Sequence, residues 1–192
     1  MLNYFKIPEI EFNHWELYEA FINNKRDWAK YGESDQNSLH TKYIDIKDPA
    51  IKKIVEQFVN PDMIENVKFF KTKAGGKVNA HSDKRNVAVN IPVQTNDNNY
   101  TVFYKSLGEH DAPSINVEGK NMTVKAKRYK SVEPVESFML YGAVCLNTKT
   151  PHGVVNESES DRIILSISFK DAYDDYNTVK KLYEQGNLTR TK

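Results

Sequence analysis

The sequence is poor in cysteine and has no long apolar run, and both shortages exclude classes of protein. Its one cysteine, Cys145, cannot form a disulfide within the chain. Together with the missing signal peptide, this favours a reducing, cytoplasmic location. Cys145 lies in the apolar stretch 139–146, so we expect a buried structural thiol. A membrane-spanning helix needs roughly 18 to 20 apolar residues, more than twice the length of this stretch, so no membrane partner is predicted.

An excess of charge of either sign is absent as well. The chain carries 27 lysine and arginine residues against 26 aspartate and glutamate residues, which gives a net charge of +1. A near-neutral chain has no broad electrostatic attraction to nucleic acid or to anionic membranes, so nucleic acid is not expected as a partner. Lysine outnumbers arginine 22 to 5. This bias would fit an AT-rich genome, and a virus-encoded protein inside a host cell is one version of the predicted location.

Length and composition place the chain among ordinary globular proteins. Its 192 residues are close to the size of one domain and long enough to bury a substantial core. With 39% apolar and 28% charged residues, the chain is not of the disordered, collagen-like or disulfide-stapled type. No internal repeat, low-complexity segment or linker interrupts it. We therefore predict a single domain over residues 1–192.

The first 65 residues carry the pattern of helices. Asn13 and Glu16 resemble a capping box, and the apolar residues that follow recur at helical spacing, which predicts a helix over about 14–30. Asp48-Pro49 is a strong start signal for a second helix, because the carboxylate can cap free N–H groups and proline suits the first turn. Residues 1–65 are therefore predicted to form a helical support for the rest of the chain.

From about residue 67 the apolar residues alternate with polar ones, which is typical of strands. Gly75-Gly76 is placed to join the first two strands as a tight hairpin or kinked pair. Residues 106–120 form a long polar connection of the kind that often covers a site. A last helix is predicted over 171–185. The predicted strands are 67–72, 77–81, 86–93, 100–104, 122–130, 136–146 and 162–169.

This order of elements favours a mainly β fold with flanking helices. Two helices, a dense series of strands over 67–169 and one final helix are typical of a β-sandwich or barrel decorated by helices. Such sheets enclose an interior, so the polar side chains that point inward are the candidates for chemistry.

His81-Ser82-Asp83 is the first candidate group. Residues i and i+2 of a strand point to the same face, so one histidine and one carboxylate can hold a single metal ion. By itself this triplet is equally well a solvated loop pair. A second histidine, His152, follows an apolar strand downstream. Two imidazoles and one carboxylate form the facial triad that suits Fe(II), but a Zn²⁺ hydrolase could use the same ligands, so the triad leaves the reaction open.

Arg162 is the second candidate. The alternation of residues 162–169 puts Arg162 and Ser166 on one face of a strand and large apolar side chains on the other. A buried arginine needs an anionic partner, which a substrate carboxylate would supply by bidentate pairing. An exposed arginine on an edge strand is the alternative.

The run from Lys73 to Asp83, followed by His152 and Arg162, resembles the Fe(II)/2-oxoglutarate-dependent dioxygenase superfamily. The pattern of that superfamily is H-x-D/E, a distal histidine, and a basic residue about ten positions further on. The resemblance covers residues 67–169. Residues 86–93 and 148–156 are similar to the aspartyl/asparaginyl β-hydroxylase-like and prolyl-hydroxylase-like branches. Animal aspartyl β-hydroxylases commonly lack the metal carboxylate, so the presence of Asp83 is a departure from them.

The resemblance implies a double-stranded β-helix core, of the jelly-roll or cupin-like type. It implies Fe(II) held by His81, Asp83 and His152, with Arg162 on the distal carboxylate of 2-oxoglutarate. Oxygen is then the further co-substrate, and ascorbate a possible reductant. Metal and co-substrate carry the difficult chemistry in such enzymes, while the protein supplies ligands and orientation.

Four further residues are weaker candidates. Ser166 shares the Arg162 face, Tyr104 could donate its hydroxyl to the same carboxylate, and Asn90 lies on the polar face of its strand. These three are predicted to contact 2-oxoglutarate. Arg85 is the candidate for binding an acidic group of the substrate. An ordinary structural or surface role is the alternative for each of them.

The resemblance thus implies an enzyme that hydroxylates a protein side chain or a small molecule, with formation of succinate and CO₂. Two other classes stay open. One is a non-catalytic jelly-roll module for binding or structure, and the other is a cupin-like metalloenzyme that does not use 2-oxoglutarate. The three hypotheses differ at Arg162 and at the metal.

Overall fold

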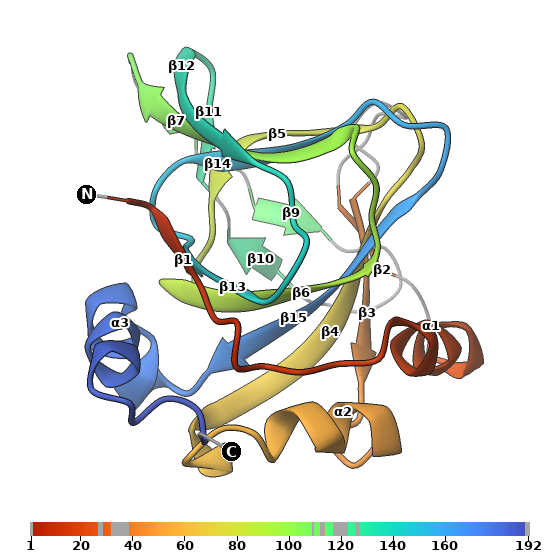
Figure 1. Cartoon of the computed structure of the whole chain (residues 1–192). Helices are drawn as coiled ribbons and strands as arrows, with labels where there is room; N and C mark the ends of the chain where they lie inside the picture. The colour runs from red at the N-terminus through yellow and green to blue at the C-terminus, as the bar shows by residue number, and fades with distance from the viewer. Residues whose placement is uncertain are drawn as a thin grey trace.

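Two antiparallel β-sheets face each other and enclose an interior in this protein (Figure 1). The structure is a computed structural model, and it describes residues 2–26, 29–31, 39–108, 110–111, 114–116, 123–125 and 127–190. The chain passes repeatedly from one sheet to the other, which is the double-stranded β-helix, or jelly roll, that was predicted.

The larger sheet has seven strands. They are β1 (Tyr4–Lys6), β2 (Ala29–Tyr31), β3 (Leu39–Ile44), β4 (Ile64–Thr72), β6 (Val87–Gln94), β13 (Val144–Asn147) and β15 (Arg162–Phe169). Their spatial order is β1-β13-β6-β15-β4-β3-β2. The central strand β15 is buried along its whole length, because it pairs with β6 on one side and β4 on the other.

The smaller sheet has six strands. They are β5 (Lys77–Ser82), β7 (Asn99–Ser106), β8 (His110–Asp111), β11 (Lys127–Tyr129), β12 (Val132–Phe138) and β14 (His152–Asn156). Their order is β12-β7-β14-β5-β11-β8, and a separate two-stranded sheet joins β9 (Ser114–Asn116) to β10 (Thr123–Lys125).

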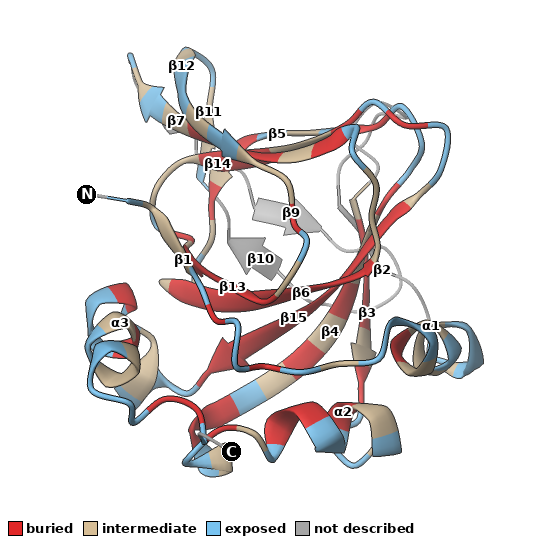
Figure 2. Cartoon of the chain, in the orientation of Figure 1, coloured by how far each residue is buried: buried red, intermediate tan, exposed pale blue. Residues whose placement is uncertain are grey.

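Within the described residues, three α-helices cover the outer face of the larger sheet: α1 (His14–Asn23), α2 (Pro49–Val55) and α3 (Tyr176–Glu184) (Figures 1 and 2). Two short 3₁₀ helices, η1 (Pro61–Met63) and η2 (Asp171–Tyr173), lie beside them in the sequence. No helix in the described part of the chain is long and apolar enough to cross a membrane.

The main core lies between these helices and the larger sheet, not inside the jelly roll. Strand β15 shows this division, since Ile163, Leu165 and Ile167 pack into the main core while Ile164 joins a small apolar cluster in the interior. The predicted alternation of this strand is therefore confirmed. Because the helices bury most of the apolar surface outside, the interior is left free for polar side chains.

The predicted helix over 14–30 is too long. Its start is confirmed, because the Asn13 side chain accepts hydrogen bonds from the backbone N–H groups of Trp15 and Glu16, but α1 ends at Asn23. The Asn24 backbone is extended, and its side-chain amide donates to the Tyr43 carbonyl of β3. The start of the second helix is also confirmed, since Asp48 caps α2.

The prediction that residues 1–65 are helical is accordingly wrong for three segments. Strands β1, β2 and β3 all lie in that region, and β3 pairs with β4 over six residue pairs. Sheet hydrogen bonds between distant segments override weak local helical preference here. The assignment of the whole chain to one domain stays a prediction.

The predicted hairpin at Gly75-Gly76 is also wrong. Strands β4 and β5 on either side of it belong to different sheets, so this turn is a crossover. Gly75 has φ +64°, the left-handed region that favours glycine, and its N–H donates to the Ser158 carbonyl at 3.1 Å. The predicted strand over 136–146 is two strands, β12 and β13, and much of 106–120 lies outside the described residues.

Candidate active site

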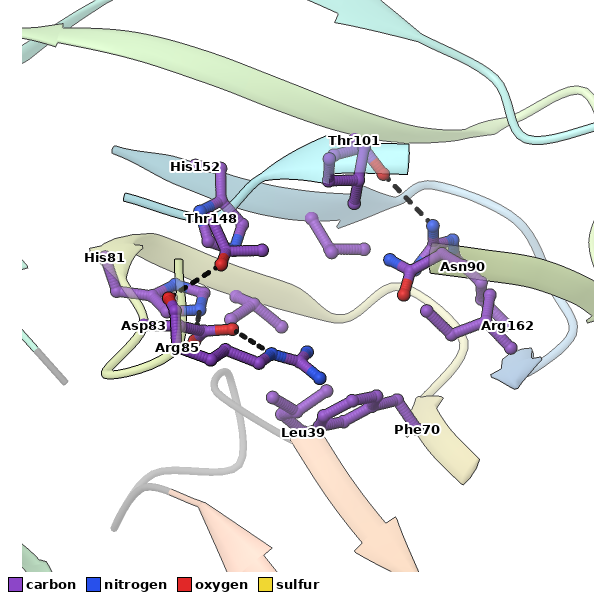
Figure 3. A pocket seen from close by; sticks show the side chains of 14 residues that line it. Leu39, Phe70, His81, Asp83, Arg85, Asn90, Thr101, Thr148, His152 and Arg162 are labelled. Atoms are coloured by element: carbon purple, nitrogen blue, oxygen red, sulfur yellow. Dashed lines mark hydrogen bonds and ion pairs between the residues drawn. The ribbon is translucent and has the colours of Figure 1, made fainter. Parts of the chain in front are cut away.

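A cavity inside the jelly roll brings together most of the predicted site residues (Figure 3). Side chains from both sheets line the cavity. His81, Asp83 and His152, a group of a type that can hold a metal ion, lie at one end, and the buried Arg162 lies at the other. The metal end is nearer to solvent, because the side chain of Asp83 is 23% exposed, whereas Arg162 is 3% exposed. The polar lining residues are His81, Asp83, Arg85, Asn90, Thr101, Thr148, His152 and Arg162.

Strand register brings the two predicted histidine ligands side by side. His152 begins β14 directly opposite His81 of β5, and Asp83 follows one residue after β5 ends. One ligand atom from each of the three residues lies within 4.8 Å of the others. His81 Nε2 is 3.6 Å from Asp83 Oδ1, and the two imidazole rings have centroids 4.5 Å apart. The structure therefore assembles the predicted triad.

Backbone carbonyls orient both imidazoles. The Nδ1 atom of His81 lies 2.8 Å from the Asn79 carbonyl oxygen, and Nδ1 of His152 lies 3.0 Å from the Thr150 carbonyl oxygen. A carbonyl can only accept a hydrogen bond, so each Nδ1 carries the proton and donates. Each Nε2 then keeps its lone pair, which is the form that binds a metal.

The charges of the triad suit a metal cation. Burial by itself opposes ionisation of Asp83, but the Arg85 guanidinium and the two histidines together hold the pKa of that carboxyl well below its ordinary value. Burial, aided by His81, lowers the pKa of His152 to about 4. At neutral pH the carboxylate is ionised and His152 is neutral, so no proton has to be displaced from either group when a metal binds.

Gly153 allows the close strand contact that positions His152. A Cβ atom at this position would lie 2.5 Å from the carbonyl oxygen of Val78 in the neighbouring strand, which is a severe clash with backbone. The contact falls where the pairing of β14 with β5 shifts register between His152 and Val154. Only glycine fits here, and it directly follows His152, one of the predicted metal ligands.

Arg162 lies at the inner end of the cavity on β15. Its terminal NH2 donates to Thr101 Oγ1 of β7 at 3.1 Å, but its Nε has no hydrogen-bond partner. The side-chain oxygen of Asn90, on β6, is also buried without a partner. Burial lowers the pKa of Arg162 to about 10, so it stays charged at neutral pH. An arginine in this state has the hydrogen-bonding capacity to take an anion.

The other predicted contacts of 2-oxoglutarate have mixed outcomes. Asn90 lines the cavity, and its contact with 2-oxoglutarate stays a prediction. Ser166 is buried on the Arg162 face, and its hydroxyl has no partner, but it is not among the lining residues. The structure does not place Tyr104 at the site. It lies on β7, where side chains alternate, and Thr101 occupies the inward face instead.

Arg85, predicted to contact substrate, also lines the cavity. Its Nε donates to Asp83 Oδ2 at 2.9 Å, and its guanidinium lies over the Phe70 ring, 5.6 Å from the centroid. Its NH1 atom is buried without a partner. The Arg85 carbonyl accepts a hydrogen bond from Thr148 Oγ1 at 2.8 Å, which ties this residue to the loop before His152.

Sequence reasoning gave no role to Thr101 and Thr148, which line the cavity, or to Gly153, which packs closely beside His152. The alternation within residues 100–104 contains the signal for Thr101, but choosing its inward face needs the fold. Gly153 gave no signal beyond its position next to His152. Lys68 is not among the lining residues, but its ammonium group lies over the ring of Phe70, which does line the cavity, and over the ring of Tyr43 on the neighbouring strand β3.

Comparisons with known proteins give no sequence relative. The chain matches no protein-family model, and no curated protein is similar to it in sequence.

Solved structures do share its fold. SnoK, a non-heme alpha-ketoglutarate-dependent carbocyclase from nogalamycin biosynthesis, matches with a TM-score of 0.53 and 13% identity over 88% of this chain and 80% of SnoK. SnoN, a non-heme alpha-ketoglutarate-dependent epimerase from the same biosynthesis, matches with a TM-score of 0.53 and 11% identity over 88% of this chain and 79% of SnoN. An oxidoreductase of the 2OG-Fe(II) oxygenase family from Burkholderia pseudomallei matches with a TM-score of 0.51 and 9% identity over 81% of this chain and 78% of that protein. This chain shares the jelly-roll fold of these three structures.

The shared fold confirms the predicted jelly-roll class. At such low identities the likeness concerns the fold, and function has to be argued from the site. None of the three structures is described as an aspartyl/asparaginyl β-hydroxylase or a prolyl hydroxylase, so that branch stays a prediction.

Proposed function

We propose that this protein is an Fe(II)- and 2-oxoglutarate-dependent oxygenase. One observation carries the proposal: a buried arginine with an unpaired Nε shares a cavity with the His81, Asp83 and His152 group. The first feature fits a carboxylate and the second fits a divalent metal ion. 2-Oxoglutarate has a carboxylate at each end, and it would need both features in one cavity.

The donor set and the orphaned polar atoms fit these two groups. Two imidazole nitrogens and one carboxylate are the ligands of the facial triad that suits Fe(II). At the inner end, the free Nε of Arg162 would complete its hydrogen bonds on the distal carboxylate of 2-oxoglutarate, next to the hydroxyl of Thr101 and the amide of Asn90. When bound, iron and 2-oxoglutarate supply the oxidising chemistry, in which one oxygen atom of O₂ enters succinate and the other enters the substrate as CO₂ is released.

The protein's own residues contribute orientation and charge. The carbonyls of Asn79 and Thr150 hold the two imidazoles in the tautomer that binds a metal. Arg85 holds one oxygen of Asp83 through a hydrogen bond, which leaves the other oxygen for the metal. Apolar side chains around the cavity, such as Ile164 and Leu146, limit the access of water to the inner end.

A hydrolase or cupin-like enzyme without 2-oxoglutarate would use the same triad. In that case, however, Arg162 would stay buried with an unsatisfied Nε. The lost hydrogen bond would lower the stability of the protein by about 1–3 kcal/mol and would serve no function. A non-catalytic jelly-roll module would carry the same cost and would have no use for the triad. The proposed oxygenase gives both features a role. We propose hydroxylation of a small molecule or a protein side chain as its reaction, with ascorbate as a reductant in the assay.

Binding of 2-oxoglutarate to metal-loaded protein tests this proposal. Protein loaded with Mn(II) in place of Fe(II) is titrated anaerobically with 2-oxoglutarate in a calorimeter, and the Fe(II) form is assayed separately for succinate with ascorbate and O₂. We expect saturable binding that requires both metal and Arg162, and slow formation of succinate without a primary substrate. Metal-loaded protein that does not bind 2-oxoglutarate would refute the proposal.

A further inference from the structure

Two cationic side chains share one aromatic ring beside the metal group. Arg85 Cζ lies 5.6 Å from the centroid of the Phe70 ring, and Lys68 Nζ lies 5.5 Å from the same centroid. Lys68 Nζ is also 5.3 Å from the ring centroid of Tyr43, on the neighbouring strand β3. Both Phe70 and Arg85 line the cavity (Figure 3). Arg85 is therefore placed where a substrate would approach the metal, and Lys68 is joined to this place through its contact with the Phe70 ring.

Each cation has unused capacity to bind an anion. The Nε of Arg85 donates a hydrogen bond to Asp83, but its NH1 is buried without a hydrogen-bond partner. Among the described residues, Lys68 makes ring contacts and neither a hydrogen bond nor an ion pair within 4.0 Å. Ring contacts leave the three N–H donors of the ammonium group without a hydrogen-bond acceptor. Burial, and after it repulsion from Arg85, lowers the pKa of Lys68 to about 8.

The acidic groups nearby do not neutralise this pair. Asp83 already accepts a hydrogen bond from Arg85 and, in the proposed function, also binds the metal. Glu65 is the other acid that acts on Lys68, and it is exposed on the strand, where solvent screens its charge. With iron and 2-oxoglutarate bound, three cationic side chains and a divalent ion would face one carboxylate and one dianion. Two positive charges remain, and a substrate anion would offset them.

We propose that the primary substrate carries a carboxylate that binds between Arg85 and Lys68 at the Phe70 ring. This inference rests on the proposed function and names the class of its substrate. The guanidinium fork and the ammonium group can both donate to carboxylate oxygens, and such charge-assisted hydrogen bonds are the strong ones. Since Arg85 also contacts a metal ligand, a carboxylate held here presents the neighbouring carbon atoms of the substrate to the metal. A free carboxylic acid and an acidic side chain of a peptide share this chemistry.

Matched acids and amides test the inference. Protein loaded with Mn(II) and saturated with 2-oxoglutarate, which occupies Arg162, is screened by thermal unfolding against phenylacetate, N-acetylaspartate and an aspartate-containing hexapeptide. Each acid is compared with its amide: phenylacetamide, N-acetylasparagine and the asparagine hexapeptide. We expect one or more of the acids to raise the unfolding temperature and its amide to have no effect. The free acids and the peptide distinguish the two sources of the carboxylate.

Lys68→Met provides the decisive variant, because Lys68 contacts no metal ligand in the structure. We expect it to weaken binding of the acid about tenfold to a hundredfold, the usual range for a lost charge-assisted hydrogen bond. Lys71→Met is the matched control, since Lys71 lies on the same strand and pairs with Asp161 at 3.5 Å. Arg85→Met is examined with its metal content measured, because Arg85 also holds Asp83.

The outcomes separate this inference from the proposed function. If no acid in the panel binds, if amides bind as well as acids, or if Lys68→Met binds the acid as tightly as the parent protein, the inference is overturned. Binding of 2-oxoglutarate is recorded in the same samples before any acid is added. Where 2-oxoglutarate binds and acids do not, only the substrate inference fails. Where 2-oxoglutarate itself does not bind, the proposed function fails.

Discussion

Replacing Arg162 by methionine should make the ligand-free protein more stable and remove its response to 2-oxoglutarate. The guanidinium is buried, its Nε has no partner, and burial lowers its pKa to about 10 from an ordinary value of 12.5. At about 1.4 kcal/mol for each pH unit, keeping this charge buried costs about 3 kcal/mol. Methionine is unbranched and fills a similar apolar space without a charge.

The expected gain is smaller than this full cost. The variant loses the hydrogen bond from Arg162 to Thr101 and leaves that hydroxyl without its partner, which subtracts about 1 kcal/mol. We therefore expect the free energy of unfolding to rise by about 1–2 kcal/mol. For a chain of this length that corresponds to an increase of about 2–8 °C in unfolding temperature, at about 2–4 °C for each kcal/mol.

Thermal unfolding of Mn(II)-loaded protein, with and without 2-oxoglutarate, checks both parts of the prediction. The parent protein should gain about 2.7 kcal/mol at a hundredfold excess of 2-oxoglutarate over its Kd, whereas Arg162→Met should gain nothing. Arg190→Met, at an exposed arginine, is the control and should change stability by less than about 0.5 kcal/mol. A variant that is less stable than the parent without ligand would show that Arg162 has a structural role. A variant that still responds to 2-oxoglutarate would show that Arg162 does not hold this co-substrate.

Four further predictions concern single side chains. Asp83→Asn should lower metal affinity at least tenfold and abolish succinate formation, measured by metal analysis and by the succinate assay. Thr101→Val should raise the Kd for 2-oxoglutarate several-fold, while Tyr104→Phe should leave it unchanged, because only Thr101 contacts Arg162. Gly153→Ala should destabilise the protein by more than about 2 kcal/mol and weaken metal binding, because its Cβ would collide with the β5 backbone. Lys68→Met should be more stable than the parent below pH 8, and this advantage should fade between pH 8 and 10.5, as the parent's lysine loses its proton in the folded and then in the unfolded state.

Each of these expectations can be contradicted separately. Full succinate formation by Asp83→Asn would remove Asp83 from the metal group. A larger effect from Tyr104→Phe than from Thr101→Val would mean that β7 presents its other face to the co-substrate. Normal metal binding by Gly153→Ala would show that the strand contact is adaptable. A stability difference for Lys68→Met that does not change with pH would show that its charge carries no cost.

The sequence predicts local structure correctly where one short segment contains all the residues that form it. The caps at Asn13 and Asp48 are confirmed, because the side chain and the N–H groups it bonds are only two or three residues apart. The alternation of β15 is confirmed for the same reason, since the period of a strand decides which residues share a face.

The sequence did not predict which distant strands pair with one another. The turn at Gly75-Gly76 has the local signs of a hairpin, yet it carries the chain between two sheets, because β4 finds its partners in β3 and β15. The helix expected to reach residue 30 stops at Asn23 for a similar reason. Hydrogen bonds to remote strands outweigh the small local differences in preference.

The sequence by itself determined the candidate chemistry, namely the residue types and spacing of His81, Asp83, His152 and Arg162. Only the tertiary structure decided that these side chains meet in one cavity, that Thr101 and not Tyr104 faces Arg162, and that Lys68 joins Arg85 at Phe70. Spacing along a strand specifies which side chains share a face, but not which face turns inward. That choice depends on how two sheets and the helices outside them divide the apolar surface between them.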